Sequence, residues 1–153
     1  MQILKTTPDR SDVRHLIRQS DAYFAGLYPA ASNHLESVEE LSSPNVLMVA
    51  AIDRNRAVAI GAVKSLTDDG QYGEIKRLFV APAFRGNGVS KLIMQYLEQH
   101  LAKNDIPCAR LETGISERIA LSLYRGLGYH ERGPFGRYSS DPLSLFMEKN
   151  LTG

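Results

Sequence analysis

Residues 80–90 combine a glycine-bearing turn with an arginine, and such a combination could bind a phosphate group. The stretch reads Val-Ala-Pro-Ala-Phe-Arg-Gly-Asn-Gly-Val-Ser. An apolar run ends at Val80, Pro82 stops it, and an amphipathic segment begins at Val89. This pattern predicts a strand, a turn and the first residues of a helix. Backbone N–H groups and the positive end of the helix dipole would then point at one place, where an anion could bind.

Three residues of the turn favour an anionic ligand. Gly86 and Gly88 let the backbone approach an anion because glycine has no Cβ, and Arg85 offers charge-assisted hydrogen bonds. A plain strand–helix turn with an incidental arginine explains these residues as well, since short glycine motifs are weak evidence alone. The turn has neither the Lys-Ser/Thr ending of a nucleoside-triphosphate loop nor the third glycine of a dinucleotide fingerprint.

The turn resembles the pyrophosphate loop of the GNAT N-acetyltransferase superfamily, whose pattern is Gln/Arg-x-x-Gly-x-Gly/Ala. Here the pattern reads Arg85-Gly86-Asn87-Gly88-Val89-Ser90, so a serine stands in place of the final Gly/Ala. Residues 74–80 and 120–129 are similar to the superfamily's fourth strand and fourth helix. Segments 27–34 and 133–144 resemble a bacterial subgroup labelled indole-3-acetic-acid acetyltransferase-like.

The resemblance implies an α/β fold of the GNAT type, with a mixed, mostly antiparallel sheet of about seven strands and about four helices, in one domain over residues 1–153. It also implies direct transfer of an acetyl group from acetyl-CoA, as cosubstrate, to a primary amine in a ternary complex, without a metal. The residues that it implies for CoA binding are Leu78, Phe79, Val80, Arg85, Gly86, Asn87, Gly88, Val89 and Ser90. The side chains of Leu78 and Val80 are expected in the core.

Tyr124 is the predicted proton donor to the departing CoA thiolate, because the resemblance implies this role for a tyrosine in the matching helix. A tyrosine has an ordinary pKa of about 10, so it holds its proton at neutral pH and can release it in the transition state. The alternative is a helix tyrosine that packs its ring in the core and hydrogen-bonds its hydroxyl.

Glu74 is the predicted base, or the carboxylate that holds a water acting as base. It lies 11 residues before Arg85, at the fourth-strand position where many superfamily members keep such a group. The alternative is an ordinary strand-edge charge beside Lys76. A chain of water molecules could also replace a dedicated base.

The residues expected at the acceptor site are Tyr28, His34, Lys76 and Phe135. Strand alternation places Lys76 on the same face as Glu74, and a cation there would favour a small amine carrying a carboxylate over a polyamine or an aminoglycoside. The alternatives are solvated surface charges and a plain surface loop. A protein N-terminus or a lysine is the alternative acceptor, and a non-catalytic acyl-CoA-binding module is the alternative function.

Composition excludes several other classes of protein. The 153 residues carry a net charge of +1 and are 43% hydrophobic, which is typical of a globular domain. Without a basic block, neither nucleic acid nor a membrane is an expected partner, while a homodimer is left open. Cys108 is the only cysteine, and the N-terminus lacks the layout of a signal peptide, so the cytoplasm is the expected compartment.

The spacing of apolar residues predicts seven strands and four helices. The predicted strands cover residues 3–5, 46–52, 57–66, 72–80, 108–113, 129–132 and 144–149. The predicted helices cover residues 12–27, 38–41 and 119–127, with one more from Val89 that ends before Pro107. Ser11 is placed to cap the first helix.

Overall fold

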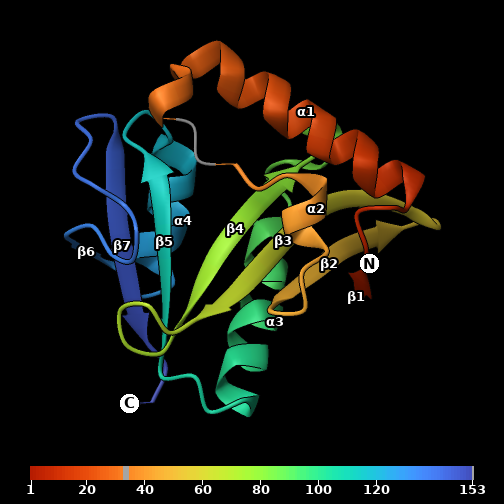
Figure 1. The fold of residues 1–153 in the computed structure, drawn as a ribbon. Coiled ribbons are helices and arrows are strands. Elements are labelled where there is room, and N and C mark those ends of the chain that lie inside the picture. The colour runs from red at the N-terminus through yellow and green to blue at the C-terminus, as the bar shows by residue number, and fades with distance from the viewer. Residues whose placement is uncertain (33–34, 153) are drawn as a thin grey trace.

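A computed structural model describes residues 1–32 and 35–152, and all named strands of this part form one seven-stranded sheet. The strand order is β1-β2-β3-β4-β5-β7-β6 (Figure 1). The strands are β1 (Gln2–Thr6), β2 (Val46–Asp53), β3 (Arg56–Leu66), β4 (Tyr72–Val80), β5 (Cys108–Gly114), β6 (His130–Arg132) and β7 (Ser144–Asn150). Neighbouring strands are antiparallel except β4 and β5, which are parallel. The predicted fold class and the predicted positions of the strands along the chain are confirmed.

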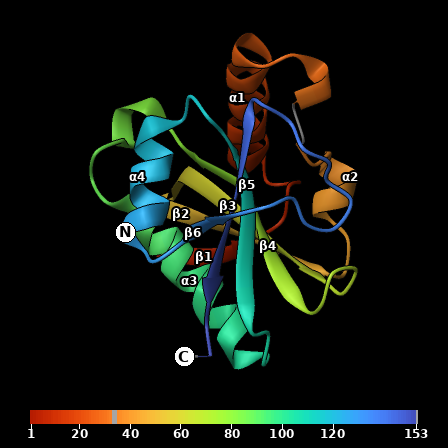
Figure 2. The ribbon, with the colours of Figure 1, turned by 90° about the vertical axis from the view of Figure 1, so that its left-hand side faces the viewer.

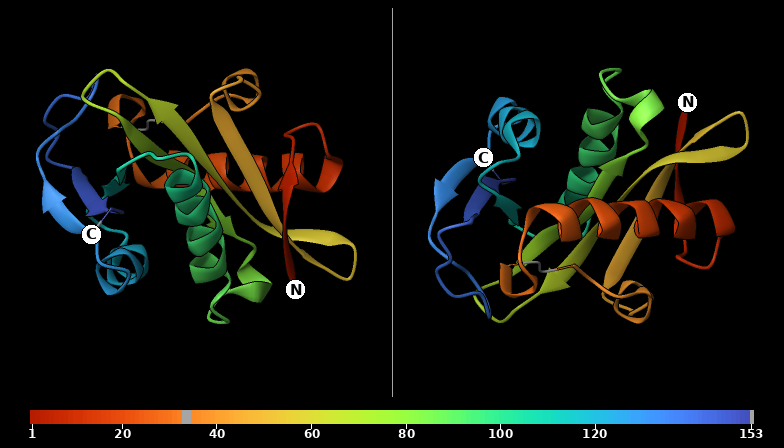
Figure 3. Two further views of the ribbon diagram at one scale, coloured as in Figure 1. Left: turned by 90° about the horizontal axis from the view of Figure 1, so that it is seen from below. Right: turned by 90° about the horizontal axis from the view of Figure 1, so that it is seen from above.

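Helices cover both faces of this sheet (Figure 3). On one face lie α1 (Ser11–Leu27) and α2 (Val38–Leu41), and on the other lie α3 (Val89–Lys103) and α4 (Arg118–Gly126). Short 3-10 turns follow α1 at Ala30–Ser32 and β4 at Pro82–Phe84. Separate apolar cores lie under α1 and under α3 with α4. Within the described residues, no helix is long and apolar enough to cross a membrane.

The start of α1 differs from the prediction, because Ser11 is its first residue and not its cap. Arg10 precedes the helix and makes no side-chain capping bond. The carboxylate of Asp12 accepts a hydrogen bond from the Val13 N–H at 2.9 Å and another from the Ala57 N–H at 2.7 Å. The Asp12 carboxylate in the first turn therefore takes the place of a capping side chain, and it also connects α1 to β3.

A β-bulge interrupts β4 at its centre. Ala62 of β3 pairs with Lys76, whereas Ile60 pairs with Phe79, so β4 has two residues where β3 has one. Arg77 takes up the extra length with a φ of 58°, a left-handed conformation that is uncommon outside glycine. The bulge turns the side chains of Lys76 and Arg77 toward the same face of the sheet, the one covered by α1 and α2.

The parallel strands β4 and β5 pair only at their first residues, Gly73 with Ala109 and Glu74 with Arg110. Beyond these pairs the two strands diverge toward α1 (Figure 1). There β4 continues to pair with β3, and β5 pairs along its length with β7. Figure 2 shows α4 and α2 on opposite sides of β5, so the divergence lies between the two helical layers.

Candidate functional site

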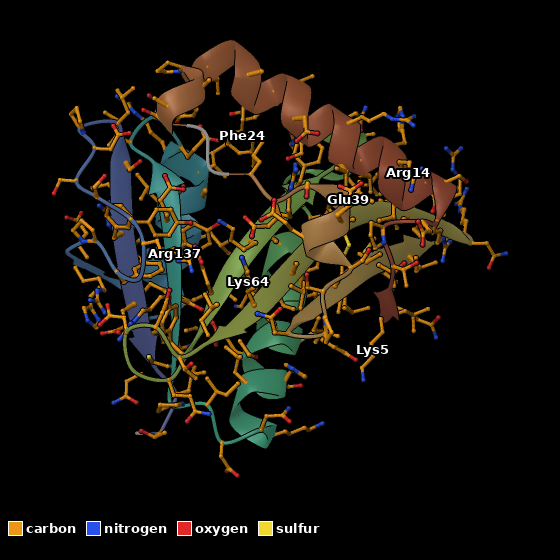
Figure 4. The ribbon with its side chains drawn as sticks, viewed as in Figure 1. Lys5, Arg14, Phe24, Glu39, Lys64 and Arg137 are labelled. Carbon is orange, nitrogen blue, oxygen red and sulfur yellow. The ribbon has the colours of Figure 1, made fainter. Side chains whose placement is uncertain are left out.

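A cavity of about 90 Å³ lies where β4 and β5 diverge. Its walls come from α1, the segment after α1, the two strands and α4. The lining residues are Phe24, Tyr28, Ser32, Leu35, Glu36, Ile75, Lys76, Arg77, Leu78, Glu112, Thr113, Gly114 and Tyr124. Figure 4 shows Phe24 on the sheet side of α1. Because its walls include residues of both helical layers, the cavity joins the two faces of the sheet.

Tyr124 on α4 is 7% exposed, and its ring packs edge-on against Tyr129 with the centroids 5.9 Å apart. Its hydroxyl lines the cavity and has no hydrogen-bond partner among the described residues. Burial, together with the negative charges of Glu117 and Glu112, holds the pKa of Tyr124 well above its ordinary value. Since buried tyrosine hydroxyls normally bond to the protein, this protonated hydroxyl is placed for a ligand.

Glu74 is the last residue of β4 that pairs with β5, and it does not line the cavity. It is 4% exposed, and its Oε2 accepts hydrogen bonds from the Tyr138 hydroxyl at 2.5 Å and from Lys76 Nζ at 3.4 Å. Burial and the neighbouring Glu74 charge hold the pKa of Tyr138 far above its ordinary value. Glu74 is therefore a buried, hydrogen-bonded carboxylate, and of its two partners Lys76 lines the cavity.

Two carboxylates that the sequence reasoning missed line the cavity. Glu112 lies on β5, and its Oε2 accepts a hydrogen bond from the Ser144 hydroxyl at 2.8 Å. Glu36 bonds Lys64 at 2.8 Å and Lys76 at 3.0 Å. Burial alone would raise the pKa of Glu36, but the two ammonium groups outweigh burial and hold it below the ordinary value. Strand alternation along β5 could have indicated Glu112, whereas Glu36 lies in a segment without periodicity.

The other predicted acceptor-site residues are placed differently from one another. Tyr28 and Lys76 line the cavity. Phe135 does not line it, because its ring is 2% exposed and packs against Tyr72 and Phe146 in a separate apolar cluster. His34 lies outside the described residues.

Tyr28 fills the place that a side chain at Gly114 would occupy. A Cβ built on Gly114 would overlap the Tyr28 hydroxyl, and that hydroxyl donates a hydrogen bond to Glu117 Oε2 at 3.3 Å. Gly114 is thus required on β5, because a residue without a side chain lets the Tyr28 ring approach the strand this closely.

The turn before α3 presents backbone donors at the N-terminus of a 15-residue helix. Gly86 and Gly88 have φ values of 82° and 74°, and Gly88 directly precedes the helix. The N–H groups of residues 86–91 have no acceptor among the described residues, and a Cβ at either glycine would meet nothing within 4 Å. The left-handed backbone accounts for the glycines, and open space lies beside the donors.

Arg85 ties this turn to the end of β4. Its Nε donates to the Val80 carbonyl at 3.0 Å, and its guanidinium lies over the Phe79 ring, 5.3 Å from the centroid. Val80 and Phe79 are buried, and Leu78 packs against the apolar core, as predicted for Leu78 and Val80. Within the described residues, no group of three or more His, Cys, Asp or Glu side chains could hold a metal ion.

Comparisons with known proteins agree with this arrangement. The model of the acetyltransferase (GNAT) family matches residues 13–129. The IAA acetyltransferase of Azospirillum brasilense is 38% identical over 149 residues, which cover 97% of each chain. A crystal structure from Klebsiella pneumoniae, named an acyl-CoA N-acyltransferase, has a TM-score of 0.82 and 31% identity over 98% of this chain and 97% of that one.

A more distant structure shares the fold. An aminoglycoside 6′-acetyltransferase of type Ii has a TM-score of 0.76 and 21% identity, over 100% of this chain and 99% of that one. A family match over most of the residues and a relative of this identity over nearly the full length lead to one conclusion: the chain belongs to the acetyltransferase (GNAT) family and is an N-acetyltransferase.

Proposed function

We propose that this N-acetyltransferase moves an acetyl group from acetyl-CoA directly to the primary amine of a small molecule, in a ternary complex. The observation that carries the proposal is the Tyr124 hydroxyl, which lines the cavity without a partner in the described part of the protein. The name of the Azospirillum brasilense relative also supports acetyl transfer.

The residues present fit a CoA-type cosubstrate. The N–H groups of residues 86–91 are suited to a pyrophosphate, because they lie at the positive end of α3 beside open space. The backbone of Leu78, Phe79 and Val80 runs where β4 has left β5, so its outward polar groups suit an extended pantetheine arm. Acetyl-CoA would supply the activated thioester.

A small acceptor suits the cavity better than a protein chain. The volume is about 90 Å³, and the segment that follows α1 and lines the cavity is bonded to the segment that precedes β7. The Ser32 hydroxyl donates a hydrogen bond to Asp141 Oδ2 at 2.6 Å, which joins these two segments. A peptide substrate would need an open groove in this place.

In the transfer step the amine nitrogen forms a bond to the acetyl carbon while the carbon–sulfur bond breaks. Tyr124 donates its proton to the departing sulfur, and a protein carboxylate or water takes the surplus proton of the amine. The raised pKa of Tyr124 keeps the hydroxyl protonated at neutral pH. Its proton is therefore available whenever both substrates are bound.

Two carboxylates compete for the amine's proton. Glu74 remains the predicted base and would act through a water molecule, because it does not line the cavity, whereas Glu112 does. The variants Glu74→Gln and Glu112→Gln distinguish the two carboxylates. Replacement of the one that acts as base should remove the acidic limb of the profile of kcat/KM against pH. Survival of that limb in both variants would assign the proton to water.

Thiol release from acetyl-CoA, measured against a panel of small amines and peptides, tests the function as a whole. We expect turnover with small amines and calorimetric CoA binding that a folded Gly88→Val variant loses. Turnover with peptides alone would favour a protein acceptor. CoA binding without release in the presence of any amine would favour the non-catalytic module.

A further inference from the structure

We propose that the acceptor is a primary amine on an apolar or aromatic skeleton that carries no carboxylate. This inference rests on the acetyl transfer proposed above and adds the chemical class of its acceptor. It reverses the expectation that Lys76 would attract an anionic substituent.

Lys76 is already matched by groups of the protein. An ammonium has three N–H donors, and Nζ lies 3.0 Å from Glu36 Oε1, 2.7 Å from the Tyr138 hydroxyl and 3.4 Å from Glu74 Oε2. The Lys76 side chain is 9% exposed. A substrate carboxylate could bind Lys76 only by displacing one partner, and it would then lie beside two negative charges.

Arg77 is occupied in the same way. Its Nη1 donates to Asp21 Oδ1 at 2.6 Å, and its Nε and Nη2 donate to the backbone carbonyl of Glu36, from Nε at 3.2 Å. The side chain is 3% exposed. Arg77 therefore holds the segment that contains Glu36 against β4. Glu36 is 6% exposed, and this contact fixes its carboxylate in the cavity wall.

Two carboxylates, Glu36 and Glu112, line the cavity beside Lys76 and Arg77. Ion pairs of the described residues bring Asp21, Glu74 and Lys64 to the same wall. A substrate carboxylate would therefore lie close to lining carboxylates, whereas a substrate ammonium would find them as acceptors.

The rest of the acceptor side is apolar and aromatic. Phe24 and Tyr28 stack with their centroids 6.2 Å apart and their planes 27° apart, and Leu35 completes this wall. Aromatic faces attract a cation and also accept an apolar skeleton. A polyamine would bring a second ammonium against this wall, where the loss of water is costly. An amine with an apolar tail matches both parts of the site.

Matched pairs of acceptors that differ only in a carboxylate test the proposal. The pairs are 2-phenylethylamine with phenylalanine, and isobutylamine with valine; spermidine serves as the polyamine. We expect kcat/KM to be about tenfold or more higher for each plain amine than for its amino acid, because the amino acid adds a like charge to the site. Titration of the same compounds into CoA-loaded protein should give the same order of affinity.

A variant pair then locates the source of the selectivity. Glu36→Gln removes one buried negative charge and should narrow the difference within each matched pair several-fold. Glu39→Gln is the control, because Glu39 is an exposed carboxylate three residues away on α2 (Figure 4), and it should leave the difference unchanged. If Glu36→Gln does not fold, the wild-type comparison still decides the question.

Failure of the inference is distinguishable from failure of the proposed function. Three results would overturn the proposed acceptor class without deciding whether the protein transfers acetyl groups. They are equal rates within the pairs, a preference for the amino acids or for spermidine, and CoA-loaded protein that binds neither plain amine. Absence of both CoA binding and thiol release with every amine and peptide would overturn the function itself, and the acceptor class with it.

Discussion

Replacing Tyr124 with phenylalanine separates catalysis from folding because of where the hydroxyl lies. The ring is buried against Tyr129, while the hydroxyl lines the cavity with no partner among the described residues. Tyr124→Phe therefore removes no protein hydrogen bond, and the free energy of unfolding should change by less than about 0.5 kcal/mol. Chemical denaturation of both proteins measures this change.

The effect on turnover should be much larger. A hydrogen bond to a charged group contributes about 1.5–3 kcal/mol. Loss of this donor to the leaving thiolate should therefore lower kcat about 10- to 150-fold, with KM for both substrates nearly unchanged. Single-turnover kinetics identify the chemical step. Because burial raises the pKa of Tyr124, the wild type should also show no basic limb of kcat from this residue below about pH 10.

Tyr129→Phe is the matched control. The Tyr129 hydroxyl donates to Glu98 Oε2 at 2.9 Å and does not line the cavity, so its loss should cost stability, about 1.5–3 kcal/mol, with kcat preserved. The reverse pattern, or wild-type turnover in Tyr124→Phe when chemistry limits the rate, would refute the donor role.

Three further changes have distinct expected outcomes. In Gly88→Val, a β-branched residue is forced to a φ of 74°, so a folded variant should lose CoA affinity in calorimetry, and unchanged affinity would contradict the pyrophosphate assignment. In Gly114→Ala, the added methyl group overlaps Tyr28, so KM for the amine should rise while CoA affinity stays constant; an unchanged KM would remove Tyr28 from the acceptor site. The depressed pKa of Glu36 should make the stability difference between wild type and Glu36→Gln full above the ordinary pKa of 4.5 and smaller as the pH falls through the folded-state pKa. A difference in the free energy of unfolding that stays constant from about pH 7 to about pH 3 would contradict the ion pairs.

The sequence predicted the local elements well because their signals are local. Apolar residues of α3 recur at three- and four-residue steps, and the helix buries Ile93, Leu97 and Leu101 as that spacing requires. Gly128 was predicted to close α4, and it has a φ of 101°. The turn at residues 85–90 could be recognised because positive φ values and unbonded amides leave a glycine pattern in the chain.

The acceptor side was harder to predict, because its charges are set by contacts between distant segments. Glu36 meets Lys64 and Lys76 across 28 and 40 positions of sequence, and nothing periodic marks it. Lys76 was expected at the acceptor site and lines the cavity. Strand alternation placed its partner Glu74 on the same face, but it gives no sign of the second partner, Glu36. Phe135 was expected at the site from its glycine-rich loop, although its ring packs against Tyr72 instead.

The bulge in β4 connects these observations. Strand alternation would place Lys76 and Arg77 on opposite faces, whereas one extra residue places both on the acceptor face. A φ of 58° at Arg77 costs about 1–2 kcal/mol, and the buried bonds of its guanidinium to Asp21 and Glu36 can offset that cost. A bulge also bends its strand, and this one lies just beyond the last pair of β4 with β5. One local distortion thus accompanies the opening of the cavity and also anchors the segment that carries Glu36, so the shape and the charge of the acceptor site have a common origin in β4.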